Sequence, residues 1–376
     1  MADDYKGVSA CVLKLDGQTA IQASSGQGAG GSQAQGAWYL ESVQVDKQLD
    51  CPDMFTVELD IRSGADIRIL DDLKEGQEVE ILMGPVGKEQ SVFKGEIHYI
   101  EPHFRHRGKS TVSIGGYDKT HRLTRGTSSR TWGDGIQSQD LKSSALSDVV
   151  QKAGSWDEGA MDGLSADGVK KSKGPKTSYV PQLNVSDYQM IRAMQSDLEA
   201  TQVAGNPVLT LVRDAPHGQG ETVIHEARFS LSTVNQVARV EVRGWDPKAK
   251  KAIVGVATAP EHSFGGTPGH QATGKALYGN ASTGKVLTIV DRPVDSKEEA
   301  DRIAQSIFSK LAMDFVTAEV DFHGDPRVKP GDLVELKEFG KRFSGKYMVR
   351  RVTHIMMPRS LPFTTRIQIA RTDIGE

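Results

Sequence analysis

The sequence is poor in the features that identify several common classes of protein. It has only two cysteines, Cys11 and Cys51, in 376 residues, which is too few for a disulfide framework and favours free thiols. No apolar run approaches the roughly 20 residues that a membrane-spanning helix requires. The segment from Met1 to Lys6 lacks the basic and apolar regions of a secretory signal. We therefore expect a protein that is made and assembled in the cytoplasm and has no membrane span.

An excess of charge of one sign is also missing. The formal net charge is −3, which argues against general nucleic-acid binding. The hydrophobic fraction of 37% is low but sufficient for a core, and it suits several small barrels better than one large core. The length allows two or three domains.

One local stretch, residues 105–130, is basic. A patch for an acidic partner protein and a site for nucleic-acid phosphates are both open interpretations. Only Phe104 and Tyr117 are available for base stacking, so we favour a solvated or subunit-facing basic rim with no nucleic-acid specificity. The basic residues are Arg105, Arg107, Lys109, Lys119, Arg122, Arg125 and Arg130.

Motifs for catalysis, metal binding and cofactor binding are missing as well. Two segments, Gly269–Ala276 and Gly279–Val286, imitate a phosphate-binding loop, but alanine and valine replace its magnesium-binding hydroxyl residue. The histidines do not show zinc-ligand spacing, no G-x-S-x-G elbow occurs, and neither cysteine has the context of a nucleophile. We therefore predict a protein that is not an enzyme, with no catalytic, cofactor-binding or metal-binding residues and no cofactor.

Several segments have clear local signatures. Residues 55–61 alternate apolar and polar residues, as a half-buried strand does. Helical spacing predicts a helix over 144–153, and capping boxes at Ser186–Gln189 and Ser296–Glu299 predict the starts of two more. Segments rich in glycine and small polar residues, at 22–37, 154–178 and 257–285, are predicted loops.

The chain repeats one strand pattern. The segment from Gly76 to Asp118 has the same length as the segment from Gly331 to Asp373, and each holds short alternating runs between glycines. Four residues of the first segment match the second at one constant offset. Only the middle slips, by five residues, which aligns Phe93 with Phe343, as hairpin loops of different length would allow. The matches are Val79 with Val334, Glu80 with Glu335, Ile81 with Leu336 and Ile114 with Ile369.

The repeat predicts the fold class. We expect a mainly β, α+β chain with two tube-like antiparallel β-barrel domains related by the internal repeat, plus a small α+β domain. The expected divisions are 1–122 for the first barrel, 123–235 for the α+β middle domain and 236–376 for the second barrel. A loop and a helix, at about 257–314, are expected as an insertion in the second barrel.

Several segments of the sequence also resemble those of a known protein family. The run from Pro326 to Arg371, with Lys329-Pro330-Gly331 and Arg342 to Tyr347 inside it, is similar to the closing segment of baseplate hub proteins. These are the late control protein D family of contractile phage tails. Their relatives occur in extracellular contractile injection systems and in the N-terminal half of type VI secretion valine-glycine-repeat spikes. Val240 to Pro247 and Phe93-Lys94-Gly95 add to the resemblance, which covers most of the chain.

The resemblance implies a structural baseplate hub of a phage tail or injection particle. It implies a homotrimer whose six barrels join a hexameric tail tube protein to a trimeric spike protein and carry force between them on contraction. Other baseplate proteins and a tape-measure protein are further implied partners. Because the sequence ends at Glu376, soon after the second unit, we expect the spike to be a separate protein.

Two other functions stay open at this point. One is a tail-associated cell-wall hydrolase, which would need an acidic or cysteine nucleophile in a cleft. The other is a tube initiator or adaptor that does not form a trimer.

Overall fold

The computed structural model describes residues 8–25, 39–49, 51–61, 67, 69–136, 141, 144–145, 179–198, 206–214, 221–246, 249–261, 263–272, 279, 284–291, 294 and 296–375. The predicted helix at 144–153 and the predicted loop at 154–178 lie almost entirely outside these residues. So does most of the glycine-rich stretch at 22–37, and only its first residues, in β2, are described. No described helix has both the length and the apolar character that crossing a membrane would take.

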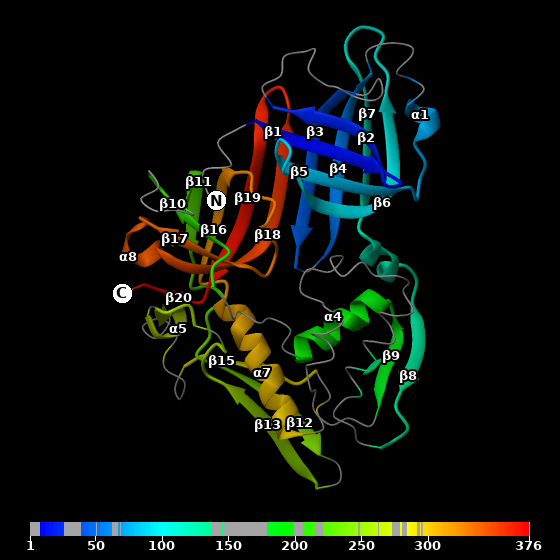
Figure 1. The fold of residues 1–376 in the computed structure, drawn as a ribbon. Coiled ribbons are helices and arrows are strands. Elements are labelled where there is room, and N and C mark those ends of the chain that lie inside the picture. The colour runs from blue at the N-terminus through cyan, green and yellow to red at the C-terminus, as the bar shows by residue number, and fades with distance from the viewer. Residues whose placement is uncertain are drawn as a thin grey trace.

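The chain is mainly β, as the sequence predicted, and its strands wrap into two barrels that lie side by side (Figure 1). Strands of the first barrel follow the order β3-β4-β7-β6-β5-β1-β2, and β2 lies next to β3 where the sheet curls round. Their bounds are β1 Ser9–Leu15, β2 Gln18–Ser24, β3 Tyr39–Gln48, β4 Cys51–Ile61, β5 Glu78–Pro85, β6 Gln90–His103 and β7 Ser110–Tyr117, with the short helix α1 Ile69–Asp72 between β4 and β5.

The second barrel is a closed ring of six strands. The hydrogen-bonded order is β17-β10-β11-β16-β19-β18, and β18 pairs with β17 to close it. The strands are β10 Leu209–Val212, β11 Glu221–Leu231, β16 Val316–His323, β17 Leu333–Lys337, β18 Gly345–Met357 and β19 Leu361–Arg371, with the short helix α8 Gly340–Phe343 between β17 and β18.

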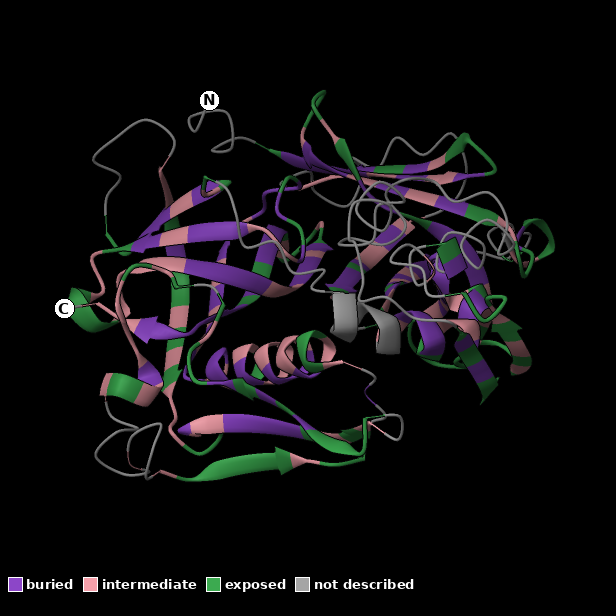
Figure 2. Cartoon of the chain, turned by 90° about the horizontal axis from the view of Figure 1, so that it is seen from below, coloured by how far each residue is buried: buried purple, intermediate pink, exposed green. Residues whose placement is uncertain are grey.

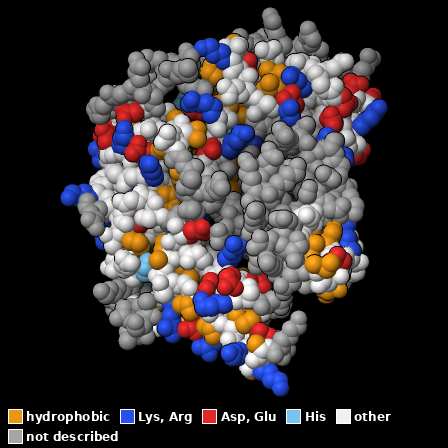
Figure 3. All heavy atoms as spheres, turned by 60° about the horizontal axis from the view of Figure 1, so that its bottom comes forward, with side chains coloured by type: hydrophobic (Ala, Val, Ile, Leu, Met, Phe, Trp, Pro, Cys, Tyr) orange, Lys and Arg blue, Asp and Glu red, His pale blue; other side chains and the backbone are white. Residues whose placement is uncertain are grey.

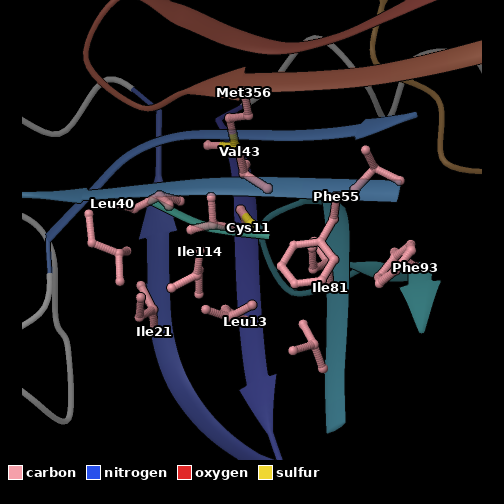
Figure 4. Close-up of a cluster of buried hydrophobic side chains, with 14 of the residues drawn as sticks. Cys11, Leu13, Ile21, Leu40, Val43, Phe55, Ile81, Phe93, Ile114 and Met356 are labelled. Carbon is pink, nitrogen blue, oxygen red and sulfur yellow. The ribbon is translucent and has the colours of Figure 1, made fainter. Parts of the chain in front are cut away.

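Each barrel has its own apolar core. Strictly alternating burial along β16, where every second residue from Val316 onward is buried, shows how one face of each strand fills the interior. Figure 4 shows part of the first core, in which Leu13, Ile21, Phe55 and Ile81 are almost fully buried. Figure 2 shows the same pattern over the whole chain, with buried residues concentrated in the barrel strands.

Two smaller lobes lie below the barrels (Figure 1). The α4 lobe follows the 3-10 helix η3 Lys119–Thr124 and consists of β8 Ser128–Trp132, β9 Val180–Val185 and α4 Asp187–Leu198. The α7 lobe is a sheet of β13, β12 and β15 covered by α7. Its bounds are β12 Arg239–Asp246, β13 Lys251–Ala257, β15 Val286–Ile289 and α7 Lys297–Ala312. Strands β14 Thr267–Pro268 and β20 Asp373–Ile374, with helix α5 Gly269–Ala272, connect this lobe to the end of the chain.

Both predicted helix starts are capped, and the first of them has a complete capping box. Ser186 Oγ accepts from Gln189 N at 3.1 Å, and Gln189 Oε1 accepts from Ser186 N at 3.0 Å. At the start of α7, Ser296 Oγ accepts from Glu299 N at 3.1 Å. These bonds satisfy N–H groups that a helix start otherwise leaves unpaired.

Polar side chains of α7 cover the free edge of β13. Asp301 Oδ1 accepts from Val256 N at 2.9 Å, Gln305 Nε2 donates to Ala259 O at 2.7 Å, and Ser309 Oγ accepts from Glu261 N at 3.0 Å. The three helical residues are spaced four apart, so they form one stripe along the helix. This edge of the α7 lobe is therefore closed to further strand pairing.

The structure confirms that the two barrels repeat one meander. Strands β5, β6 and β7 pair in sequence, and so do β17, β18 and β19. Val79 lies opposite Gly95, and Val334 lies opposite Tyr347. The N–H of Gly76 donates to Ile97 O at 2.8 Å, and the N–H of Gly331 donates to Val349 O at the same distance. Ile97 and Val349 therefore occupy the same place in the two meanders.

The repeat extends to irregularities that no side-chain pattern reveals. In β6 the register skips His98, and at the equivalent place in β18 it skips Arg350. In β3 it skips Glu41, and in β11 it skips His225. Each skipped residue is a β-bulge, which bends a strand and increases its twist. Because the bulges coincide, β3 and β11 are equivalent strands, as are β6 and β18.

The structure corrects two of the sequence matches. Ile114 lies opposite Ile100, and Ile367 lies opposite Val352, so Ile114 corresponds to Ile367 rather than to Ile369. Lys94 corresponds to Lys346, since each lies opposite a matched glutamate, whereas the predicted slip in the middle aligned Phe93 with Phe343. Phe343 belongs to helix α8 in the turn between β17 and β18, and this insertion misled the alignment.

Sheet membership also differs from the expected domain division. Strands β10 and β11 fall within 123–235, yet they are strands of the second barrel. Strands β12, β13 and β15 fall within 236–376, yet they form a separate sheet under α7. The physical reason is that β10 pairs in parallel with both β11 and β17. Parallel pairing is not signalled by a hairpin turn, and β17 lies far from β10 in the sequence, so local sequence does not identify either partner.

Candidate functional site: the seam between the barrels

One strand, β18, joins the two barrels. On one side its first residues pair with β17, whereas residues from Arg351 to Met356 pair with β3 of the first barrel. Its other side pairs with β19. The two barrels therefore share a continuous sheet of 13 strands, and we call the β18–β3 contact the seam.

Apolar side chains cross the seam in both directions. Met356 of β18 and Phe363 of β19 belong to the core of the first barrel, where Met356 lies next to Val43 (Figure 4). Leu49, just after β3, packs against Met313 and Leu333 of the second half. Fully burying one such side chain contributes about 1.5–3 kcal/mol, so this exchange resists separation of the barrels.

A buried carboxylate lies in the middle of the seam. Asp46 of β3 accepts from Thr353 Oγ1 at 2.6 Å, from Arg351 Nη2 at 2.8 Å and from Gln44 Nε2 at 2.6 Å. Burial alone would raise the pKa of Asp46, but the hydrogen bonds from Thr353, Gln44 and Arg351 outweigh it and lower the pKa below its usual value. The charged form of Asp46 thus holds the two barrels in register.

A cavity of about 460 Å³ lies beside the seam. The first barrel supplies Lys47, Asp53 and Asp118 to its wall, and the second half supplies Val328 and His354. Its volume is within the range of ligand sites, but the groups in it bond mainly to one another. Lys47 Nζ lies 3.4 Å from Asp53 Oδ2, and Lys119 Nζ lies 2.8 Å from Glu78 Oε1.

Two titratable groups in this cavity have strongly shifted pKa values. Burial raises the pKa of Asp118 to about 8, and the nearby charge of Asp53 adds to the shift. Burial lowers the pKa of His354 to about 3, aided by the charge of Lys47. Both side chains are therefore neutral at pH 7. His354 Nδ1 bonds with Thr365 Oγ1 at 3.0 Å, and Asp118 Oδ1 accepts from Thr120 Oγ1 at 2.5 Å.

An ion pair near the end of the chain fixes the second barrel to the α7 lobe. Arg371 Nη2 lies 2.7 Å from Asp373 Oδ1, and both side chains are buried. Asp373 Oδ2 also accepts from Phe264 N at 2.6 Å and from Ser263 Oγ at 3.0 Å. This pair therefore holds the segment that follows β13 against the barrel.

The predicted basic stretch is not a free cationic patch. Lys109 pairs with Glu41 and Arg122 with Glu96, and Arg130 Nη2 lies 2.5 Å from Asp187 Oδ1. With Lys119 also paired, four of the seven basic residues are neutralised within the chain. On the face in Figure 3, acidic and basic side chains are interspersed over the described surface. The arrangement favours the predicted solvated or subunit-facing rim over a phosphate-binding surface.

Other residues considered from the sequence do not assemble into a reactive site. Cys11 is buried in the first core, and burial raises its pKa to about 12. His98 meets His121 edge to face with ring centroids 4.8 Å apart, and His121 stacks on Tyr117 at 4.4 Å. Within the described part of the chain, no three His, Cys, Asp or Glu side chains are placed to hold a metal ion.

The two phosphate-loop imitations fall partly outside the described residues. Gly269 starts α5, and its N–H donates to Thr372 O at 3.0 Å. After Lys285 comes strand β15, as predicted, so no helix follows the second imitation.

The sequence did not identify the seam residues Asp46, Arg351, Thr353 and His354. One signal was present. Strand β18 has 13 residues, whereas β17, which pairs with one side of it, has only five. The remaining residues on that side of β18 therefore need a second partner strand. Which strand that partner is depends on tertiary structure.

Comparisons with known proteins support a fold found in phage tails. The 43 kDa tail protein of prophage MuSo2 from Shewanella oneidensis is 13% identical, with a TM-score of 0.63 over 98% of this chain and 100% of that one. A tail protein from Neisseria meningitidis is 12% identical, with a TM-score of 0.63 over 98% of each chain. Prophage tail protein gp18 from Listeria monocytogenes is 10% identical, with a TM-score of 0.50 over 97% of this chain and 94% of that one.

Sequence comparisons add little to the assignment of this fold. A family model described as the Alg8 N-terminal domain matches residues 184–357, which is less than half of the chain. That segment ends before β19, without which the second barrel does not close, so it is not a complete structural unit. No curated protein sequence matches. The barrels, the seam and the structural neighbours together establish that this chain has the fold of a phage tail protein.

Proposed function

We propose that the chain is the baseplate hub of a contractile tail or injection particle. Three copies form a homotrimer whose six barrels mate with a hexameric tail tube on one side and a trimeric spike on the other. The hub nucleates the tube and carries force to the spike on contraction. Other baseplate proteins and a tape-measure protein complete its set of partners, and the particle is assembled in the bacterial cytoplasm.

The observation that carries this proposal is the matched pair of bulged meanders. A threefold object can present six similar surfaces only if each subunit carries the surface twice. The equivalence of His98 with Arg350 and of Glu41 with His225 means that the two barrels share bends at two corresponding places. Barrels with matching bends can occupy alternate places in one ring.

The seam supports a role in force transmission for the pair of barrels. Asp46, Met356 and Phe363 fix the first barrel to the second through backbone pairing, burial and charge. A subunit that transmits force must keep its domains in a fixed relation, and a shared strand does so better than a flexible linker.

The mass of the purified chain tests the proposal. We expect a particle of three times the chain mass of 40.8 kDa at micromolar concentration, alone or with the tube and spike proteins present. Threefold symmetry of the chain in an electron microscopy map of the particle is the matching structural result. A lasting monomer in the presence of both partners would contradict it and favour a non-trimeric initiator or adaptor.

The cell-wall hydrolase has no favouring observation among the described residues. A turbidity assay on peptidoglycan with the purified chain tests it directly. We expect no clearing above that produced by heat-denatured protein.

A further inference from the structure

We infer that the open edge of β6 in one copy pairs with the open edge of β11 in the next copy. This inference rests on the proposed function, since it needs copies arranged around a common axis. It names the strands and the register by which one copy meets another.

The argument starts from the seam inside one chain. There the second half of β18 pairs with β3. The strand equivalent to β18 in the first barrel is β6, and the strand equivalent to β3 in the second barrel is β11. In a ring of six similar barrels, three seams lie within chains and three between them. If the seams are alike, the three between chains join β6 to β11.

Both edges are open where this pairing requires it. Strand β6 pairs with β5 as far as Glu96, and Ile97 still bonds to Gly76 and Gln77 on that side. From Tyr99 onward its sole strand partner among the described residues is β7. Strand β11 pairs with β10 only at Glu221 to Val223, and beyond that its partner in the described chain is β16. Unpaired N–H and C=O groups at such edges are ready to bind another strand.

The backbone groups on the two edges are also in phase. Ser232 N donates to Phe315 O at 2.9 Å. Backbone hydrogen bonds in an antiparallel pair involve every second residue, so Ser232, Ser230 and Arg228 bond to β16. The residues between them, Leu231 and Phe229, therefore direct their N–H and C=O groups to the open edge. On β6, Pro102 has no N–H and is tolerated only where its nitrogen faces an open edge. Pro102 and Phe229 therefore meet as the equivalents of His354 and Val45 in the seam. The proline costs this pairing one hydrogen bond.

The charges on the two edges are complementary in this register. Extended two residues past the end of β6, the register places Arg105 opposite Glu226. Within β6 it places Glu101 diagonally opposite Arg228. All four side chains are exposed, and none of them lies within ion-pair distance of another described residue of its own chain. Within the chain, Arg228 also lies opposite Glu319, and the charge of Glu226 acts on Arg366. In antiparallel strands both directly opposite and diagonal residues interact. Two cross-copy pairs of opposite charge thus favour a second copy of this chain as the occupant.

A disulfide trap tests the register. Glu101 lies opposite Ser230 at a place without backbone bonds, where Cα atoms come within about 4.5 Å and a disulfide fits. The variant Glu101→Cys with Ser230→Cys is made in a Cys51→Ser background, because Cys51 is exposed. The matched control is Glu101→Cys with Ser129→Cys, whose second cysteine lies on β8 of the α4 lobe.

Under mild oxidation we expect the first variant to give covalent dimers and trimers on a non-reducing gel, with none larger, and the control to give several-fold less. A chain that is trimeric by mass but does not cross-link above the control would overturn the inference and leave the proposed function standing. Monomeric mass without cross-links would overturn both. A ladder beyond three would support the strand pairing and contradict the closed trimer.

A charge reversal provides an independent readout. Arg228→Glu places two carboxylates together, and we expect it to raise the dissociation constant of the trimer at least tenfold. Adding Glu101→Arg restores the attraction and should recover most of the loss. Failure of the double variant to recover, with circular dichroism unchanged, would count against the register.

Discussion

Arg371 and Asp373 form a 2.7 Å ion pair with side chains that are 2% and 0% exposed. Neither group can find water if the other is removed, because Ser344 O, Ser263 and Phe264 complete their shell of hydrogen bonds. The pair fixes the second barrel to the α7 lobe at the place where the last strands of the chain meet that lobe.

Asp373→Ala should therefore be strongly destabilising. It leaves the guanidinium of Arg371 buried without its counter-charge, and breaking such a pair typically costs about 3–5 kcal/mol. Urea unfolding followed by circular dichroism measures the loss. As a control, Lys297→Ala removes the exposed ion pair with Asp301 and should leave the midpoint unchanged. A similar midpoint shift for both variants would contradict the special role of the buried pair.

Asp118 should make the folded state less stable as pH rises. The folded chain keeps its carboxyl protonated up to a pKa of about 8, whereas the unfolded chain ionises near pH 4. Between these values the unfolded state binds fewer protons, so the contribution of Asp118 is largest below pH 4 and is lost progressively up to pH 8.

Asp118→Asn resembles the protonated form and should remove this dependence. We expect the variant to match the wild type near pH 4 and to exceed it by on the order of 2 kcal/mol or more at pH 8. Thermal unfolding across this range checks the prediction. Parallel curves for the two proteins would show that Asp118 is already ionised in the folded state.

Asp46 should have the opposite pH signature at the seam. Its folded pKa is lowered, because hydrogen bonds from Thr353, Gln44 and Arg351 outweigh burial, so its contribution is present above about pH 4 and is lost as pH falls through the folded pKa. Asp46→Ala should destabilise the chain by about 2–4 kcal/mol at pH 7. Hydrogen exchange should rise first in β3 and the second half of β18. Uniform exchange throughout both barrels would argue against a local effect on the seam.

Gly255 should be intolerant of a side chain. A Cβ atom there would lie 2.1 Å from the backbone carbon of Ala300 in α7, and a helix backbone cannot yield as a flexible side chain can. Gly255→Ala should cost about 1–3 kcal/mol through overpacking. Val254→Ala, on the outer face of the same strand, is the control and should cost much less. Equal costs in thermal unfolding would mean that α7 shifts freely on its sheet.

Ser296 should contribute the usual energy of a helix cap. Ser296→Ala removes the acceptor of the Glu299 N–H and should destabilise α7 by about 1 kcal/mol. Ser296→Asp keeps an acceptor and should restore most of the stability. If both variants unfold alike, the hydrogen bond is not the source of the effect.

How far the sequence predicts this molecule depends on how local each signal is. The caps at Ser186 and Ser296 are local hydrogen bonds, and both were predicted correctly. The match of Val79 to Val334 was also found, because period-two alternation is visible in any strand. The bulges at His98 and Arg350 were not found, since an extra residue becomes evident only when the opposite strand is known.

The seam shows where sequence reasoning reaches its limit. Asp46 and Thr353 lie far apart in the chain, and each looks like an ordinary polar residue on a half-buried strand. Their contact depends on two barrels meeting along β18, which no local propensity encodes. The same holds for β10, whose four residues gave no hint that they complete a barrel with β17.

The paired bulges also limit how such a chain can change over time. His98 and Arg350 differ in chemistry, as do Glu41 and His225, so substitution at these places is tolerated. Deletion of a bulged residue is not tolerated in the same way, because losing one residue from a strand turns every later side chain to the opposite face of the sheet. The two halves are therefore free to differ in composition at these places, while each of these strands must keep its extra residue.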